Sequence, residues 1–160
     1  MMREVRRDDW YRRTTWTEED REAFEGRLRR ARRANRPGYL RVQGSVLAGS
    51  EDPELRGVGR ELLARAIDED DSDWPLEAQW ARAELARAFA RDGQLAEAER
   101  WYRACAKCQE DHGGYGVNTD CHVGLAEVLL RRAPEDAGVA EEAGRRPGQG
   151  SGPEPAALSR

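Results

Sequence analysis

Three cysteines and two histidines lie close together and are residue types that bind zinc. They form a C-x-x-C pair, Cys105 and Cys108, followed by His112, Cys121 and His122, all within 18 residues. Thiolate and imidazole groups at such short spacings are the usual ligands of a structural zinc ion. One hypothesis is therefore a small zinc-binding helical protein with the ligands Cys105, Cys108, His112 and Cys121.

Helical periodicity supports a different interpretation of these thiols. At 100° per residue, one arc of about 140° holds six side chains of a helix expected over 95–110: Leu95, Ala98, Trp101, Tyr102, Cys105 and Cys108. Both thiols then belong to an apolar face, where cysteine packs as a small hydrophobic residue. Both cysteines also lie near the C-terminal end of this expected helix. Thiol redox chemistry instead needs a helix N-terminus, whose field lowers the thiol pKa. Structural packing without a metal or other cofactor is favoured.

The segment "RLRRARRANR", residues 27–36, contains six arginines that could contact phosphate groups. On a helix, five of them point away from Leu28, Ala31 and Ala34, so a solvated face is the expected role. The net charge of −4 gives the chain no overall basic field, and nucleic acid is not favoured as a partner. All basic residues except Lys107 are arginine, a bias typical of GC-rich, bacterial-like coding sequences.

Catalytic and phosphate-binding signatures are missing from the sequence. The acidic run "DEDDSD" lacks the Gly and Glu of a calcium loop, and "HGGYG" lacks the Lys and Ser/Thr of a phosphate-binding loop. There is no G-x-S-x-G, and both histidines flank the same loop. These observations predict a protein that is not an enzyme and has no small-molecule substrate.

Composition and hydropathy predict a cytoplasmic protein. The N-terminal segment is charged and lacks an apolar signal region, and no 18 apolar residues follow one another, so no contact with a membrane is expected. The odd number of cysteines favours reduced thiols. Hydrophobic residues at 38% and charged residues at 36% suit a thin, elongated body better than a compact sphere.

Short helices are the elements expected to position these residues. Capping residues, prolines and apolar spacing predict helices over 17–35, 37–48, 53–68, 75–91, 95–110 and 119–132. No segment shows sustained strand alternation, so the predicted class is all-α. The domain is expected to cover residues 1–133. Residues 134–160, with four of the seven prolines and no aromatic residue, are predicted to form a disordered tail.

An aromatic arm, residues 1–16, precedes the first predicted helix. Trp10, Tyr11 and Trp16 are expected to pack over the first helical hairpin as a cap. The alternative is that these rings dock a partner or a second copy of the chain, which would be a route to self-association.

The segment 79–105 resembles the tetratricopeptide repeat, whose pattern is W-x2-L-G-x2-Y, then A-x3-F, then P, over 34 residues. The residues that carry the resemblance are Leu85, Ala86, Phe89, Ala98 and Tyr102, and the departures are Arg82 in place of Trp and Glu110 near the expected Pro. A partial copy precedes it at Leu40, Gly44, Leu47, Gly59 and Leu63, and a half copy follows at His122, Leu125, Ala126 and Leu129. The alternative is a generic alanine-rich helical bundle.

This resemblance implies a short α-solenoid of about three antiparallel hairpins that binds a protein or peptide without catalysis. The first helix of each repeat would line a concave groove. The groove residues carried over from the repeat are Arg41, Ser45, Trp80, Ala83, Arg87, Ala90, Arg91, Val123, Glu127 and Arg131. Four arginines among them would make the groove locally basic and suited to an acidic segment or a chain-terminal carboxylate.

Overall fold

The computed structural model describes residues 9–112 and 120–144, with side chains described as far as Pro134. Six α-helices follow one another: α1 Glu18–Arg30, α2 Arg36–Ala48, α3 Pro53–Glu69, α4 Leu76–Arg91, α5 Leu95–Asp111 and α6 Cys121–Gly144, with a short 3-10 helix, η1 Arg33–Asn35, before α2. Within these residues there is no strand, which confirms the predicted all-α class.

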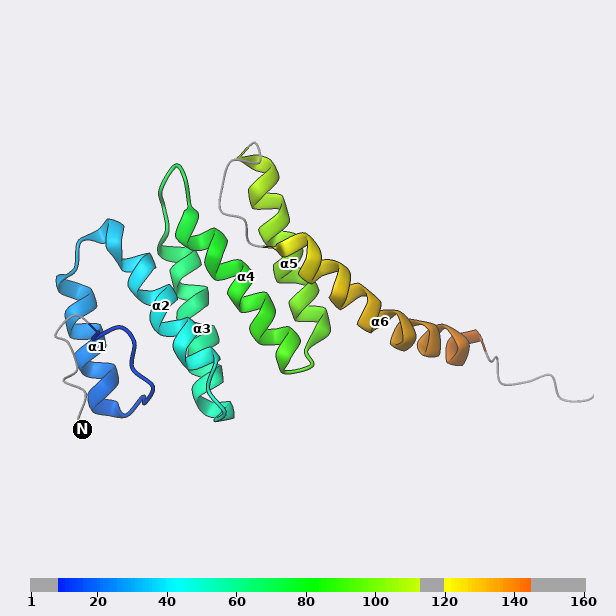
Figure 1. Ribbon diagram of the computed structural model, residues 1–160, viewed down its shortest axis with the longest axis horizontal. Coiled ribbons are helices and arrows are strands. Elements are labelled where there is room, and N and C mark those ends of the chain that lie inside the picture. Colours follow the sequence, from blue (N-terminus) through cyan, green and yellow to red (C-terminus); the bar gives the residue numbers. More distant parts are fainter. Residues whose placement is uncertain (1–8, 113–119, 145–160) are drawn as a thin grey trace, which may run out of the picture.

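The helices are arranged in a row that follows the chain (Figure 1). From α2 to α6 each helix packs against the next, and α2 and α6 both contact α4 as well. One hydrophobic core lies among α1 to α4 and includes Phe24, Leu40 and Leu63. A second core, among α4 to α6, includes Tyr102 and Val128. No helix among the described residues is long and apolar enough to cross a membrane.

Small residues allow the closest helix contacts. A Cβ atom added to Gly59 on α3 would lie 2.7 Å from the carbonyl oxygen of Gly44 on α2, so the two backbones touch. At the corresponding places of α4 and α5, Ala86 and Ala98 are completely buried. These four positions are the ones that the repeat pattern predicted at helix contacts.

The aromatic arm packs on α1 and α2, as predicted, from its first described residue, Asp9, onward. The Trp10 ring lies 5.3 Å from the Phe24 ring and 4.8 Å from the Tyr39 ring. The buried amide of Gln43 on α2 fixes the arm by accepting a hydrogen bond from the backbone N–H of Arg13 (2.9 Å) and donating one to its carbonyl (2.8 Å). Because a buried amide must be paired, this contact determines where the arm lies.

The predicted helix over 17–35 is wrong in its last five residues, 31–35. The structure ends α1 at Arg30 because Ala31 is extended, with φ −71° and ψ 151°. The Arg36 guanidinium then donates hydrogen bonds to the carbonyls of Ala31 (3.4 Å) and Arg29 (3.0 Å), which satisfies acceptors that the helix leaves unpaired. The arginine-rich run is therefore divided between α1, η1 and the first residue of α2.

The predicted end of the last helix at 132 is also wrong. α6 contains Pro134 and continues to Gly144, so a disordered tail does not begin at 134. Proline removes one backbone hydrogen bond, but the alanines and glutamates that follow have high helix propensity and sustain the helix. The remaining part of the predicted tail, residues 145–160, lies outside the described residues.

Candidate functional site

Arg41 on α2 stands at the centre of a polar cluster with α4. Its Nε donates to Glu77 Oε2 at 2.6 Å and its Nη1 donates to Glu84 Oε1 at 3.0 Å. The guanidinium carbon also lies 4.9 Å from the centre of the Trp80 ring. Glu77, Trp80 and Glu84 are three to four residues apart, so one face of α4 carries all three side chains toward α2.

Burial shifts the ionisation of this cluster. Burial alone lowers the pKa of Arg41, but its hydrogen bond with Glu77 and the charges of both glutamates outweigh this effect and raise the pKa above the usual value. Burial raises the pKa of Glu84, and the charge of Arg41 and a hydrogen bond from Ser45 only partly oppose the rise. Arg41 is thus permanently charged, whereas Glu84 is the group of the cluster that is harder to ionise.

Two hollows flank Arg41 along the α2–α4 face. The first, of about 300 Å³, lies between Arg41, Glu77 and the aromatic rings of Tyr11 and Tyr39. The second, of about 180 Å³, is lined by Ser45, Ala48, Gly49, Leu63, Glu84, Arg87, Ala88 and Arg91. Both hollows combine apolar walls with charged groups, a composition typical of sites that hold a peptide side chain.

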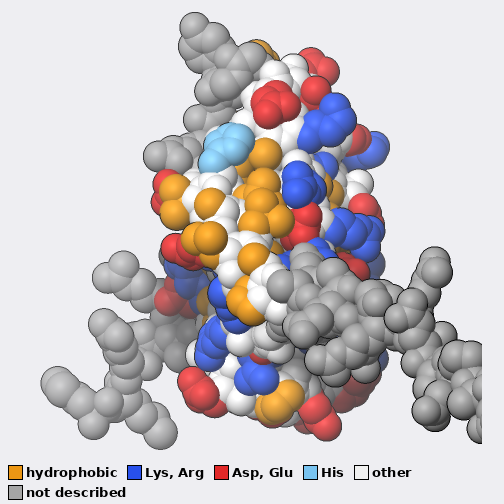
Figure 2. All heavy atoms as spheres, turned by 90° about the vertical axis from the view of Figure 1, so that its right-hand side faces the viewer, with side chains coloured by type: hydrophobic (Ala, Val, Ile, Leu, Met, Phe, Trp, Pro, Cys, Tyr) orange, Lys and Arg blue, Asp and Glu red, His pale blue; other side chains and the backbone are white. Residues whose placement is uncertain are grey.

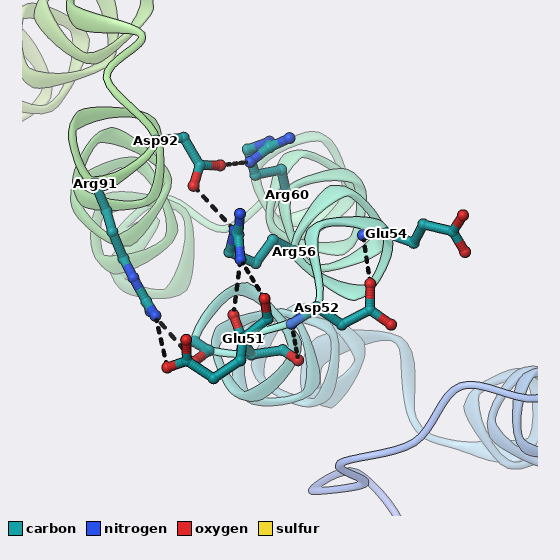
Figure 3. Close-up of polar contacts among 9 residues, drawn as sticks. Glu51, Asp52, Glu54, Arg56, Arg60, Arg91 and Asp92 are labelled. Atoms are coloured by element: carbon teal, nitrogen blue, oxygen red, sulfur yellow. Dashed lines mark hydrogen bonds and ion pairs between the residues drawn. The ribbon is translucent and has the colours of Figure 1, made fainter.

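An ion-pair network closes the far end of the second hollow (Figure 3). Arg91 donates to the carbonyl of Gly49 at 3.2 Å and lies 3.5 Å from a carboxylate oxygen of Glu51. Asp92, at the end of α4, pairs with two arginines of α3, Arg60 and, at 2.9 Å, Arg56. Arg91 thus connects the end of α4 to the α2–α3 turn, and Asp92 connects it to α3.

The groove position predicted for Ala83 is wrong, because this residue is buried in the second core. The charged and aromatic groove residues fall into two groups. Arg41, Trp80, Arg87 and Arg91 lie on the α2–α4 face, and the last two line the same hollow. Glu127 and Arg131 are exposed one turn apart on α6, and Arg131 reaches α4 through a hydrogen bond to the carbonyl of Ala90 at 3.2 Å.

The sequence analysis missed the carboxylates of this face. Glu77 and Glu84 pair with Arg41, so this arginine does not add uncompensated positive charge and the face carries both signs. A signal was present, because Glu77 and Glu84 share the helical face of Trp80. It could be used only with the knowledge that α2 packs beside α4.

The four candidate zinc ligands do not converge. Cys105 is buried, and its Sγ lies 3.6 Å from the carbonyl oxygen of Gln79 on α4. Cys121 donates to Gln109 at 2.9 Å, and Cys108 Sγ lies 3.9 Å from Nδ1 of His112. Among the residues that the structure describes, no three His, Cys, Asp or Glu side chains could hold a metal ion together. The fold uses Cys105 and Cys121 as core residues.

No known protein-family model, curated protein or solved structure matches this chain. Over residues 9–112 and 120–144 the protein is all-helical, with six packed helices and a mixed-charge face between α2 and α4.

Glu84→Gln is expected to change the pH dependence of folding. Because burial raises the pKa of Glu84 in the folded state, the wild type loses stability as pH rises from the unfolded-state pKa, near 4.5, through the folded-state pKa. Glutamine does not ionise, so the variant does not lose this stability. The melting temperature of the variant minus that of the wild type should therefore increase between pH 4 and pH 7. Thermal melts followed by circular dichroism measure this difference. Glu61→Gln, on the exposed surface of α3, controls for the lost charge, and an equal trend there would contradict the prediction.

Proposed function

We propose that this chain is a non-catalytic protein-interaction module that binds a peptide or protein segment across the α2–α4 face. In this proposal the helices form tetratricopeptide-like hairpins, α2 with α3 and α4 with α5, and α6 opens a third. The bound segment would lie along the first helices of the hairpins. The proposed compartment is the cytoplasm, in keeping with the three cysteines, all of which are free thiols.

One observation carries the proposal: two hollows lie on the same face, on either side of the Arg41 and Trp80 pair. A peptide segment needs a surface that accepts alternate side chains and orients the backbone between them. Trp80 supplies a rigid apolar surface, and the charged network around Arg41 supplies fixed hydrogen-bonding groups.

The charges around the second hollow favour an acidic occupant. Glu84 is harder to ionise than a free glutamate, while Arg87 and Arg91 are exposed at the rim. Arg91 lies 3.5 Å from the exposed Glu51, so an incoming carboxylate would take the place of Glu51 there. A guanidinium presents five N–H donors and binds a carboxylate through two parallel hydrogen bonds. An acidic side chain or a chain-terminal carboxylate is therefore the group that this end of the face would select.

The hairpin arrangement is supported by the repetition of small residues at helix contacts. Gly44 meets Gly59 between α2 and α3, and Ala86 and Ala98 are fully buried on α4 and α5. The two pairs occupy corresponding places of the repeat pattern. In addition, α2 contacts α4 and α4 contacts α6, which is the contact pattern expected when first helices stack along one face.

Arg87→Glu combined with Arg91→Glu is expected to abolish partner capture. Reversing both charges at the rim replaces attraction for a carboxylate by repulsion, which should weaken binding at least about tenfold. The measurement is quantitative mass spectrometry of proteins captured from a lysate by the immobilised full-length chain. Arg100→Glu with Arg103→Glu is the matched control, because these exposed arginines lie on α5 and pair only with neighbours of their own helix in the contacts seen.

Circular dichroism must show that both double variants remain folded. If the α4 variant captures the same proteins as the wild type, or if both variants lose them equally, binding does not depend on the α2–α4 face and the proposal fails.

A further inference from the structure

The outer side of α6 is an exposed apolar surface. The described residues include five large exposed apolar side chains, and three belong to α6: Val123, Leu129 and Leu130, which are 59%, 40% and 75% exposed. Figure 2 shows this end of the molecule, where apolar side chains form a continuous column. A patch of this kind on a polar chain indicates a surface that another element covers.

The two earlier hairpins show what covers the corresponding surface. On α2, Gly44 and Leu47 are buried beneath α3, and on α4 the equivalent Ala86 is buried beneath α5. The equivalent positions on α6 are Ala126 and Leu129, and both are exposed. Because the same pattern of residues packs under an antiparallel helix twice in this chain, the missing cover on α6 is also a helix.

We propose that α6 pairs in an antiparallel manner with α6 of a second copy of this chain. Its exposed apolar row consists of Val123, Ala126, Leu130 and Ala133, with spacings of three, four and three residues. These three spacings are the same when the helix is read in the opposite direction. A two-fold axis level with residue 128 places Val123 beside Ala133 of the second copy, and Ala126 beside its Leu130. Each large side chain then meets an alanine, as close helix packing requires.

Charge complementarity favours the same partner and the same direction. Glu127 and Arg131 lie on one edge of the apolar row and are both exposed. With the axis level with residue 128, Glu127 lies level with residue 129 of the other copy, about 3 Å along the helix from its Arg131, an offset that long side chains span. A parallel two-fold pair would instead place the two Glu127–Arg131 edges on opposite sides of the contact, where these groups could not pair with each other. The bond from Arg131 to Ala90 uses one of five guanidinium donors.

The position of α6 leaves room for this pairing. It is the last helix of the row among residues 9–112 and 120–144, and its C-terminal part projects beyond α5 (Figure 1). The dimer would occupy Glu127 and Arg131, the two groove residues predicted on α6, and would leave the α2–α4 face with its two hollows open in each copy.

Sedimentation equilibrium of the full chain tests the pairing. We expect the average mass to rise from monomer to dimer as concentration increases over about 1–300 μM, a range that covers ordinary helix-pair affinities. Leu130→Glu should raise the dissociation constant of the dimer at least about tenfold, because it introduces two charges, one from each copy, into a buried contact. Leu76→Glu is the matched control, since Leu76 is also an exposed leucine, at 40%, but lies on α4.

Charge reversal distinguishes self-pairing from any other cover. Glu127→Arg and Arg131→Glu should each weaken the dimer, and the double variant should restore it because both cross-pairs return with opposite polarity. A mixture of the two single variants should form a heterodimer more readily than either forms a homodimer, with each chain followed by its own fluorescent label.

Three results would overturn the proposal. One is a protein that remains monomeric at every concentration. If Leu130→Glu then lowers the melting temperature of this monomer more than Leu76→Glu does, another part of the same chain covers α6. A second is a dimer that Leu130→Glu leaves unchanged. The third is failure of the double charge reversal to recover what the single variants lose.

Discussion

Gly59→Ala is expected to destabilise the protein by about 3 kcal/mol, the upper part of the range for an overpacked contact. The added Cβ atom would lie 2.2 Å from the backbone nitrogen of Ala48 and 2.7 Å from the carbonyl oxygen of Gly44. Both are backbone atoms of α2, so no side-chain rotation can relieve the clash. α2 and α3 would have to separate, which would loosen the core around Leu47 and Leu63. Urea unfolding followed by circular dichroism measures the loss.

Gly57→Ala, two residues earlier on α3, is the matched control. No atom lies within 4 Å of a Cβ atom placed there. Replacing a helical glycine with alanine then gains about 0.5–1 kcal/mol from helix propensity alone. The two substitutions are chemically identical and should have opposite signs. A stabilising effect at both positions would show that α2 and α3 do not approach each other as closely as described.

The sequence predicted the core of this fold because its helix contacts depend on residue size at fixed spacing. Gly44, Gly59, Ala86 and Ala98 were identified from the repeat pattern, and each lies buried at a helix contact. The breaks were predicted less well. The end of α1 depends on an extended Ala31 and on Arg36 binding carbonyls of the preceding turns, an interaction that propensity does not include.

The candidate face was predicted in its arginines and Trp80 but not in its carboxylates. Arg41 and Trp80 could be placed from the repeat pattern, but the carboxylate partners of Arg41 depend on how α2 packs against α4. Spacing along one helix does not determine which carboxylate meets an arginine 36 or 43 residues away. The cysteine cluster shows that short spacing along the chain does not determine side-chain geometry either. Cys105 and Cys121 lie in one core, but among the described residues no three possible ligands converge on a metal position.

Gly124→Ala is expected to destabilise the packing of α6 by about 2–3 kcal/mol. A Cβ atom at this position would lie 2.3 Å from Cζ of Tyr102, which is closer than van der Waals contact allows. Tyr102 is 5% exposed and belongs to the second core with Cys121 and Val128, so the ring cannot move to solvent without disrupting that core. The contact therefore joins α5 to α6 more strictly than an ordinary hydrophobic pair, and urea unfolding should show the loss.

A double-mutant cycle distinguishes this clash from a general effect of alanine. Tyr102→Ala alone should cost about 3–5 kcal/mol through the cavity that it leaves. In that background Gly124→Ala should cost almost nothing, because the methyl group enters the space that the ring occupied, and the coupling energy should reach about 2 kcal/mol. Additive losses would mean that Gly124 is required for the backbone of α6 and not for the ring.

The same substitution also bears on self-association, because α6 carries the apolar row from Val123 to Ala133. A variant that releases α6 from α5 should weaken the dimer in sedimentation equilibrium, whereas Gly26→Ala, on the remote helix α1, should not.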